Sequence, residues 1–583
     1  MAEPRQQARP VNRVSVLHST TVRCDAAATR GEEGSSRESD TATLLLVDPF
    51  AGFLAGLPSD STVLLFQSPP TVPYGHSTLD GDLSRPRKKQ RRAKDGRLVA
   101  EAKEVHEGVY DAFVEPVTLL LNSEFIRNRT EPWWLRDPSR VHQHAHSVHS
   151  FARPESFVNG TFGEAGTLDD GIGEDRSQGL HVDALHGRFI QNDAPIPMVF
   201  SMGNAEESTC AAFFMPSQSA ILTTDLLQAD QRRFPPGWQA LLSQVREHGG
   251  VDLLYVDPPY PNMSAERLAR SSMSANEDGN AASMHRHSSY ATAADLYDLW
   301  RLRAPLTSLL AASRGQAPAR RTRTLVAFWI TNAPKVRRFI LNKFWPQLGV
   351  RYEGEWCWLK MTAGASSGAR GFPPQPVVSM AQPERKKPYE ILLLGWAGGD
   401  AGAAGQRGEQ QAFRKQIFAS VPIGHSRKPA IVDLLAEYVH QQRALEPAAE
   451  APRRGCIRKR RVPQTGTRGD GCLLAVELFG RTALSGSLLH APLTAGAACA
   501  AALPVASSSS AATPECGGDG DSDVDADERN ACRCVYVSVG NEASKFNQHG
   551  VGLLVAGAKS PAAATKAVRL AGVSRHADSV AQD

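Results

Sequence analysis

The feature that most constrains this chain is a series of short apolar runs with the length and composition of buried strands. They are Ala220-Ile221-Leu222, Val251 to Val256, Leu325 to Ile330, Ile391 to Leu394 and Cys472 to Phe479. Helical patterns separate most of them, at Asp295 to Leu310, Val336 to Phe344 and Ala430 to Gln442. This alternation predicts a doubly wound α/β domain, a class that binds ligands at the carboxyl ends of its strands.

Between these runs lie segments whose composition does not favour packing. The chain has 583 residues, of which 48 are glycine and 38 are proline, and we expect one large domain with inserts. Low-complexity sequence rich in Gly, Ala, Ser, Arg or acidic residues predicts surface inserts at about 266–287, 361–382, 397–412, 443–470 and 485–531.

The two ends of the chain carry less packing signal. We predict that residues 1–105 are largely disordered, that 106–200 form an accessory N-terminal region, and that 551–583 are a tail. The run from Arg85 to Arg92 is typical of a nuclear-localisation element or a phosphate contact, with a solvated charge run as the alternative. We therefore expect a nuclear protein, with the cytoplasm as a second compartment.

Overall charge and cysteine content exclude little. The net charge of +4 does not by itself indicate a nucleic-acid partner. The sequence contains no run of about 18 uninterrupted apolar residues, so we expect no membrane span. The nine cysteines are scattered, and the four histidines between His142 and His149 lack a further ligand, so we expect no metal site.

One apolar run ends in Asp257-Pro258-Pro259-Tyr260, whose residue types suit chemistry on an amino group. Two prolines fix a stiff turn and remove amide donors, so acceptors remain. The Asp257 carboxylate and the Pro258 carbonyl can each accept a proton from adenine N6, and its lone pair would then face a methyl sulfonium. Tyr260 offers a ring for base stacking. An ordinary Asp-Pro-Pro turn is the alternative, and the strand-end position favours catalysis.

Further motifs follow the tetrapeptide in a fixed order. They are Asn262 with Ser264, Phe328 to Asn332, Glu355 to Lys360, Lys386 to Gly395, Ser420 to Pro422, Ser426 to Pro429, Glu477 to Arg481, and Gly540-Asn541-Glu542 with Lys545-Phe546. Together they resemble the MT-A family of adenine-N6 methyltransferases, and within it the methyltransferase-like protein 4 branch. The resemblance covers roughly residues 201–550, and collinear motifs are more specific than any single one.

The resemblance implies an α/β, Rossmann-like S-adenosylmethionine-dependent methyltransferase domain over 201–550, with a permuted motif order in which the catalytic strand precedes the cofactor-binding strands. It implies S-adenosylmethionine as cofactor and adenine in RNA or DNA as acceptor. Catalysis falls on Asp257, Pro258, Pro259 and Tyr260. Cofactor binding falls on Asp225, Asp257, Lys428, Glu477, Phe479, Arg481, Asn541 and Glu542, and nucleic-acid binding on Tyr260, Asn262, Arg267 and Arg270.

Individual roles also come from the resemblance. Lys428 matches a lysine that pairs with the cofactor carboxylate, which suits a flexible ammonium. Asn541 and Glu542 match a pair near the ribose hydroxyls, and Asp225 aligns loosely with a position near the cofactor adenine. Glu477 and Arg481 flank the same pocket.

The chain also departs from the family pattern. The tetrapeptide ends in Tyr260 where Trp is usual, and Arg427 stands where His is usual. After Arg481, an expected polar stretch containing Trp is replaced by Thr482-Ala483-Leu484-Ser485. The short basic loop after Asn262 is expanded, and its arginines could steer phosphates toward the cleft or belong to a solvated insert.

Two other functions stay open beside an active enzyme. One is a catalytically silent, nucleic-acid-binding scaffold of the same fold, which the intact Asp257 and Lys428 disfavour. The other is a methyltransferase of a planar amide such as protein glutamine, which favours Asn at the first tetrapeptide position. The sequence leaves undecided whether the target is DNA or RNA, whether it is adenosine or 2′-O-methyladenosine, and the oligomeric state.

Overall fold

A computed structural model describes the chain in separate stretches. They are residues 15–24, 40–57, 61–65, 133–135, 138–143, 187–192, 198–202, 211–227, 234–261, 293, 295–313, 323–364, 374–378, 387–398, 415–423, 427–444, 473–489, 534–541, 543 and 554–555. Predictions for the basic run at 85–92 and the tail at 556–583 lie outside these residues, as do those for Asn262, Arg267, Arg270 and Glu542.

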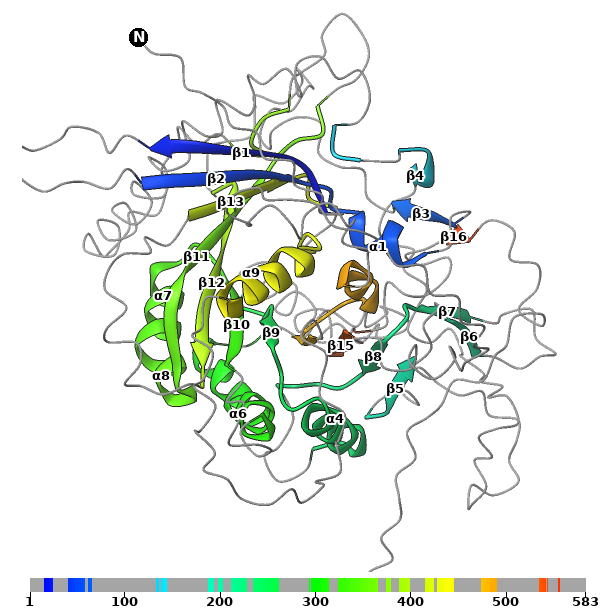
Figure 1. The fold of residues 1–583 in the computed structure, drawn as a ribbon, viewed down its shortest axis with the longest axis vertical. Helices are drawn as coiled ribbons and strands as arrows, with labels where there is room; N and C mark the ends of the chain where they lie inside the picture. Colours follow the sequence, from blue (N-terminus) through cyan, green and yellow to red (C-terminus); the bar gives the residue numbers. More distant parts are fainter. Residues whose placement is uncertain are drawn as a thin grey trace, which may run out of the picture.

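An eleven-stranded mixed sheet organises the molecule (Figure 1). Its spatial order is β1-β2-β13-β11-β12-β10-β9-β14-β15-β8-β5. In chain order the strands are β1 Val16–Cys24, β2 Asp40–Val47, β5 Phe189–Asn192, β8 Ser219–Leu222, β9 Leu253–Val256, β10 Thr324–Ile330, β11 Val350–Lys360, β12 Tyr389–Ala397, β13 Lys415–Ser420, β14 Leu474–Leu478 and β15 Val535–Val539.

The central strands are parallel, and the chain changes direction across the sheet between β9 and β14. β9 pairs in parallel with β10 on one side and with β14 on the other. The chain continues from β9 to β10 in one direction, whereas β14 is followed by its other neighbour, β15. The carboxyl ends of β9 and β14 therefore form a topological switch point, where doubly wound sheets bind ligands.

Helices cover both faces of the sheet. They are α1 Ala51–Gly56, α4 Pro236–Glu247, α6 Arg303–Ala312, α7 Pro334–Phe339, α8 Trp345–Leu348 and α9 Val432–Ala444, with 3-10 turns η1 Pro138–Arg140, η4 Leu296–Leu302 and η6 Ala483–Leu489 and a π turn η5 Ile340–Phe344. Leu254 and Val256 of β9 pack in the core with α4, α6 and α7, whereas Leu253 and Tyr255 pack in the core with α9. Figure 1 shows α9 across the sheet from α7 and α8. The apolar runs are strands because both faces are covered.

Each of the five runs predicted as buried strands is a strand of this sheet. They correspond to β8, β9, β10, β12 and β14. The predicted helical patterns correspond to η4 with α6, to α7 with η5, and to α9. The sequence did not predict β11, β13 or β15, although each lies within the same sheet. The α/β class with parallel central strands is confirmed.

The prediction that residues 1–105 are largely disordered is wrong for the stretch that forms β1, β2 and α1. β2 pairs in parallel with β13, and β1 pairs with β2 in antiparallel fashion, so this hairpin extends the sheet. Leu44, Leu46 and Val47 are fully buried. One apolar patch is sufficient to order this stretch because β2 adds to a sheet that the rest of the chain already forms, through its pairing with β13.

Two predicted boundaries also need correction. The domain predicted at 201–550 begins too late, since β5 pairs with β8 within the main sheet. The insert predicted at 485–531 begins too early, because η6 is buried, with Leu488 only 3% exposed. The insert predicted at 361–382 has the same error, as Met361 and Val377 are each 1% exposed.

Smaller elements flank the main sheet. β3 Ser61–Leu65 lies between β16 Leu554–Val555 and β4 Val141–Gln143 in a three-stranded sheet, and β6 Met198–Met202 pairs with β7 Ala211–Met215. In the stretches that the structure describes, no helix has the length and apolar character that a membrane crossing requires.

Candidate active site

Asp257 is the first residue after β9, at the switch point. Its backbone N–H donates to the Leu478 carbonyl at 3.2 Å, which continues the parallel pairing with β14 beyond the end of the strand. The Tyr260 N–H donates to the Pro258 carbonyl at 2.9 Å and closes the tight turn expected of two consecutive prolines. The tetrapeptide is therefore a rigid turn at the carboxyl edge of the sheet.

Tyr260 is fixed at the edge of this turn. Its hydroxyl donates to the Trp329 carbonyl at 2.7 Å, and its ring packs against the core. The Pro258 carbonyl keeps a second lone pair beyond the one used by Tyr260. The acceptor role predicted for that carbonyl therefore remains available, while the Tyr260 hydroxyl has a structural role.

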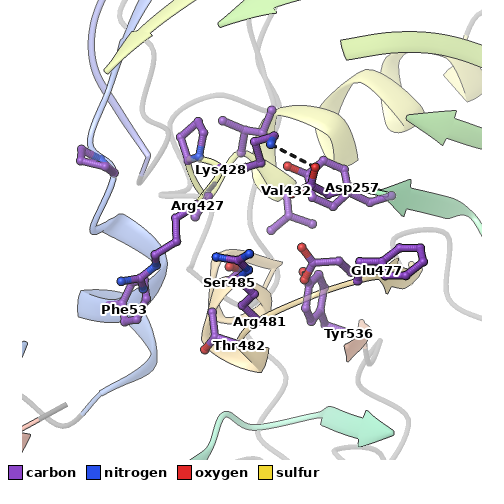
Figure 2. Close-up of a pocket in the computed structure, with 16 residues that line it drawn as sticks. Phe53, Asp257, Arg427, Lys428, Val432, Glu477, Arg481, Thr482, Ser485 and Tyr536 are labelled. Carbon is purple, nitrogen blue, oxygen red and sulfur yellow. Dashed lines mark hydrogen bonds and ion pairs between the residues drawn. The ribbon is translucent and has the colours of Figure 1, made fainter. Parts of the chain in front are cut away.

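Lys428 bridges two carboxylates. Its Nζ lies 3.0 Å from Asp257 Oδ1 (Figure 2). It also lies 3.0 Å from Glu390 Oε2 and 5.3 Å from the Trp329 ring centroid. Glu390, the second residue of β12, also pairs with Lys360 of β11. Four segments distant in sequence thus place two acids and two lysines together at the end of β9.

The electrostatics of this cluster follow from burial and from Lys428. Burial raises the pKa of Asp257, Lys428 opposes the rise, and Glu390 adds to it. Burial alone would raise the pKa of Glu390, but Lys428 and Lys360 outweigh it and hold it at about 2. Burial lowers the Lys428 pKa, but Asp257 and Glu390 raise it by more. Glu390 and Lys428 are therefore charged over the neutral range.

A second acidic group lies at the end of the neighbouring strand. Tyr536 of β15 donates a hydrogen bond to Glu477 of β14. Burial raises the Glu477 pKa to about 8, with Tyr536 lowering it and Asp257 raising it. Close behind, Phe479 has a positive φ of 64°. A Cβ at Gly480 would lie 2.1 Å from Ser538 Oγ and 2.6 Å from Glu477 Oε2, so only glycine leaves this carboxylate its place.

Asp257, Lys428, Glu477, Phe479 and Tyr536 line one pocket that is open to solvent (Figure 2). Of the predicted site residues, the structure brings together Asp257, Lys428, Glu477, Phe479 and Arg481. Figure 2 shows Asp257 and Lys428 on one side of the pocket and Phe53 on the far side, with Arg481 between them.

Two predicted cofactor residues lie at the same edge of the sheet but outside this lining. Asp225 follows β8, and its carboxylate accepts the Leu227 N–H at 2.9 Å. Asn541 follows β15 and is exposed. The ends of β8 and β15 are joined by a backbone hydrogen bond, in which the Gly540 N–H donates to the Leu222 carbonyl at 3.1 Å.

The pocket also contains residues that the sequence did not predict. They are Pro49, Phe53, Tyr255, Arg427, Thr482, Ser485 and Tyr536, among others. Tyr255 of β9 could have been found, because it lies two residues before Asp257 in one extended run and therefore faces the same side of the sheet. No motif near Phe53 in the sequence predicts that this residue lines the pocket. The stretch Thr482 to Ser485, noted as a departure from the family pattern, forms part of the pocket wall.

Fold and site together define a doubly wound α/β domain with a polar pocket at its switch point. Residues 318–451 match the MT-A70 family model. Lys428 and Glu390 lie inside the matched segment. Asp257 and Glu477 lie outside it, and parallel pairing of β9 with β10 and β14 brings them beside it.

Several known proteins are similar to this chain. The N6-methyladenosine RNA methyltransferase MTA1 of Pyricularia oryzae is 26% identical over 259 residues, which cover 42% of this chain and 56% of that protein. The N(6)-adenine-specific methyltransferase METTL4 is 25% identical in Mus musculus, over 44% of this chain and 42% of the relative, and 26% identical in Homo sapiens, over 43% and 42%. The matches thus span about half the length of these relatives.

A solved structure is similar over a comparable share of the chain. It is TTHA0409 from Thermus thermophilus, described as a candidate DNA modification methylase and complexed with S-adenosyl-L-methionine. The two are 15% identical, and the similarity covers 46% of this chain and 81% of the other, with a TM-score of 0.18.

Proposed function

We propose that this chain is an S-adenosylmethionine-dependent methyltransferase that acts on the N6 amine of adenine in a nucleic acid. The observation that carries the proposal is the position of Asp257, a partly buried carboxylate at the switch-point end of β9 that lines the pocket. The match to the MT-A70 family model and the relatives named as N6-adenine methyltransferases support it.

The chemistry of the pocket fits the proposed cofactor. S-adenosylmethionine, when bound, supplies a methyl group on a sulfonium. The Glu477 carboxyl can accept from the hydroxyls of a ribose, and the space kept by Gly480 leaves it free to do so. Phe479 offers an apolar surface, and basic side chains suit the carboxylate of an amino acid.

Asp257 performs the central task on the acceptor. An adenine amine donates two protons, and its lone pair is delocalised into the ring. A carboxylate that accepts one of these protons orients the nitrogen and stabilises the positive charge that develops on it. Lys428 holds Asp257 by an ion pair at 3.0 Å, which fixes the carboxylate and favours its charged form.

Methyl transfer to synthetic oligonucleotides tests the proposal. The full chain should transfer labelled methyl groups from S-adenosylmethionine to adenine-containing RNA or DNA, with N6-methyladenine identified by mass spectrometry. Asp257→Ala should abolish transfer, and Glu247→Ala, which removes a carboxylate on α4 outside the pocket, should not. An unchanged rate in Asp257→Ala would overturn the mechanism. Cofactor binding by the wild type without transfer to any adenine acceptor would favour the scaffold function.

The acceptor and the compartment are further parts of the proposal. We take RNA as the first acceptor to test, because a similar protein is named as an RNA methyltransferase, with DNA as the alternative. Mass spectrometry of modified adenosines in DNA and in size-fractionated RNA, with and without the gene, separates the two and distinguishes adenosine from 2′-O-methyladenosine. Nuclear localisation rests on the basic run at 85–92, and imaging of a variant without that run tests it.

A further inference from the structure

The tetrapeptide lies between the two faces of the sheet. The pocket opens on the face that α9 covers, since Tyr255 and Val432 belong to the core on that side and both line the pocket. Tyr260 packs instead against the core on the other face, which contains α7 and the 3-10 turn η4. A base held by the Tyr260 ring therefore approaches from the side of η4 and α7.

Both of these elements begin near the tetrapeptide. The Ala293 N–H donates to the Pro259 carbonyl at 2.9 Å, and η4 begins three residues after Ala293. The Tyr260 hydroxyl donates to the Trp329 carbonyl at 2.7 Å, and α7 begins five residues after Trp329. Side chains that are exposed on η4 and α7 therefore lie where the strand beside a target base would run.

Tyr297 of η4 presents an aromatic ring on this surface, and the residue is 58% exposed. The Phe339 ring lies nearly perpendicular to it, with centroids 5.9 Å apart, and Lys343 Nζ lies 5.9 Å from the Tyr297 centroid. Asp295 caps η4 by accepting a hydrogen bond from the Tyr297 N–H. The ring is thus held by its neighbours and open to solvent, which is the arrangement that base stacking requires.

The helical segment beside Tyr297 is basic. α7 and η5 together carry four basic residues and no acidic one. Lys335 and Lys343 are exposed, whereas Arg337 is paired with Glu355 at 3.0 Å. The two acids at the start of η4 serve its capping box. Two exposed lysines beside an exposed ring suit a strand that offers both phosphates and bases.

We propose that η4 and α7 bind an unpaired stretch of the acceptor nucleic acid beside the target adenine, with a base stacked on Tyr297 and phosphates paired with Lys343 and Lys335. The inference rests on the proposed function, and it names the form of substrate that the site takes. A base within a duplex is already stacked between its neighbours, so only an unpaired strand offers Tyr297 a base. The acceptor is therefore single-stranded around the adenine.

Three RNA probes test the proposal by fluorescence anisotropy with the full-length protein. The first is a single strand with a central adenine, the second replaces the bases beside that adenine with abasic nucleotides, and the third is the first strand paired with its complement. The wild type should bind the first most tightly. Tyr297→Ala should weaken binding of the first by about fivefold or more, the lower limit expected of base stacking, and change binding of the abasic strand by about twofold or less. Tyr297→Phe keeps the ring and should bind like the wild type.

The lysines should behave differently from the ring. Lys343→Gln should weaken binding of the single strand and of the abasic strand alike, because both keep their phosphates. It should also reduce the slope of log affinity against log salt by about 0.7, the value for one phosphate contact on a single strand.

Two controls remove matching side chains at the edge of the sheet away from the tetrapeptide. Arg246→Gln removes an exposed cation from the last turn of α4, which leads to the start of β9. Tyr352→Ala removes a tyrosine that is 46% exposed near the start of β11, where its hydroxyl lies 3.4 Å from Glu355. Neither should change any of the dissociation constants.

The inference is overturned if Tyr297→Ala leaves binding of the single strand unchanged, which would favour a protein partner for this surface. It is also overturned if that variant weakens binding of the abasic strand to the same extent, or if the wild type binds the duplex as tightly as the single strand. If the strand binds as expected but no methyl group reaches its adenine, the proposed function fails and the binding surface stands.

Discussion

Asp257 combines two opposing requirements in one side chain. In the proposed reaction it accepts a hydrogen bond from a neutral amine, which the charged form does best, yet it is partly buried, which disfavours charge. Lys428 reconciles the two by pairing at 3.0 Å, and Glu390 in turn keeps the lysine charged. Removal of Lys428 would leave two acids without the cation they share.

The rate of methyl transfer should fall on the acid side at a pH above the ordinary aspartate pKa of 3.8. Burial raises the Asp257 pKa, so the carboxylate gains a proton, and loses its acceptor role, before an exposed aspartate would. Lys428 lowers that pKa, so Lys428→Met should move the acid limb to still higher pH. A kcat profile against pH measures both. A limb at or below pH 3.8, or one unmoved in the variant, would contradict this account.

Cofactor binding should release a proton from Glu477. Because its pKa is about 8, this group is mostly protonated at pH 7 in the free protein. Ribose hydroxyl donors and a nearby sulfonium favour the carboxylate, so binding lowers the pKa and affinity rises as the pH approaches 8. Calorimetry in buffers of different ionisation enthalpy counts the protons released. Glu477→Gln should release none, and an equal release in that variant would assign the proton to another group.

At the scale of single elements, prediction from sequence succeeded where one segment carries its own pattern. β9 and β10 are continuous apolar runs because both faces are buried, and that pattern is visible in one dimension. β11 was missed because its first half is partly exposed and contains a register shift, with Tyr352 46% exposed, while only its second half is a continuous buried run. β15 is five residues long and follows a long low-complexity segment.

The candidate site divides in the same way. Asp257, Lys428, Glu477 and Arg481 lie in local motifs, and the family resemblance implied that they belong to one site. The contact between Phe53 and Arg427 depends on the parallel pairing of β2 with β13, two strands more than 360 residues apart. No local pattern specifies that pairing, because the backbone hydrogen bonds that β2 makes with β13 could be made with any parallel strand at the edge of a sheet.

Asp252 joins β9 to β14 and α9, and it has a role in the fold but none in the proposed reaction. It lies just before β9 and is fully buried, and its carboxylate accepts the Leu474 N–H of β14 at 2.7 Å and pairs with Arg443 of α9. Asp252→Ala should lower the free energy of unfolding by about 2 kcal/mol or more, the cost of losing charged hydrogen bonds in the interior. Chemical denaturation measures it.

Glu247→Ala is the matched control for that substitution. Glu247 is exposed, and its carboxylate accepts a hydrogen bond from Ser243 Oγ at 3.0 Å on the surface of α4. Substitutions at such surface positions usually change the free energy of unfolding by about 0.5 kcal/mol or less. Equal losses in the two variants would mean that Asp252 does not join β9, β14 and α9 in the way its contacts indicate.

At the scale of the whole molecule, residues 15–24 and 40–57 complete both the sheet and the pocket. The β1–β2 hairpin covers the edge of β13, and α1 then places Phe53 and Pro49 on the pocket wall. Cofactor binding and the folding of the N-terminal segment are therefore coupled, because the same helix closes the pocket and buries apolar side chains such as Phe50.

Gly52→Leu tests this coupling. Its Cβ would lie 3.0 Å from a backbone atom of η6, so α1 must move away from η6 and carry Phe53 with it. We expect weaker cofactor binding together with a loss of about 1–3 kcal/mol in stability, the usual cost of overpacking. Ala55→Leu adds the same side chain to an exposed position of the same helix and should change neither. Calorimetry and thermal unfolding compare the two variants. Unaltered cofactor binding in a destabilised Gly52→Leu protein would show that α1 supports the fold alone, since a wall that forms part of the site cannot shift without a change in affinity.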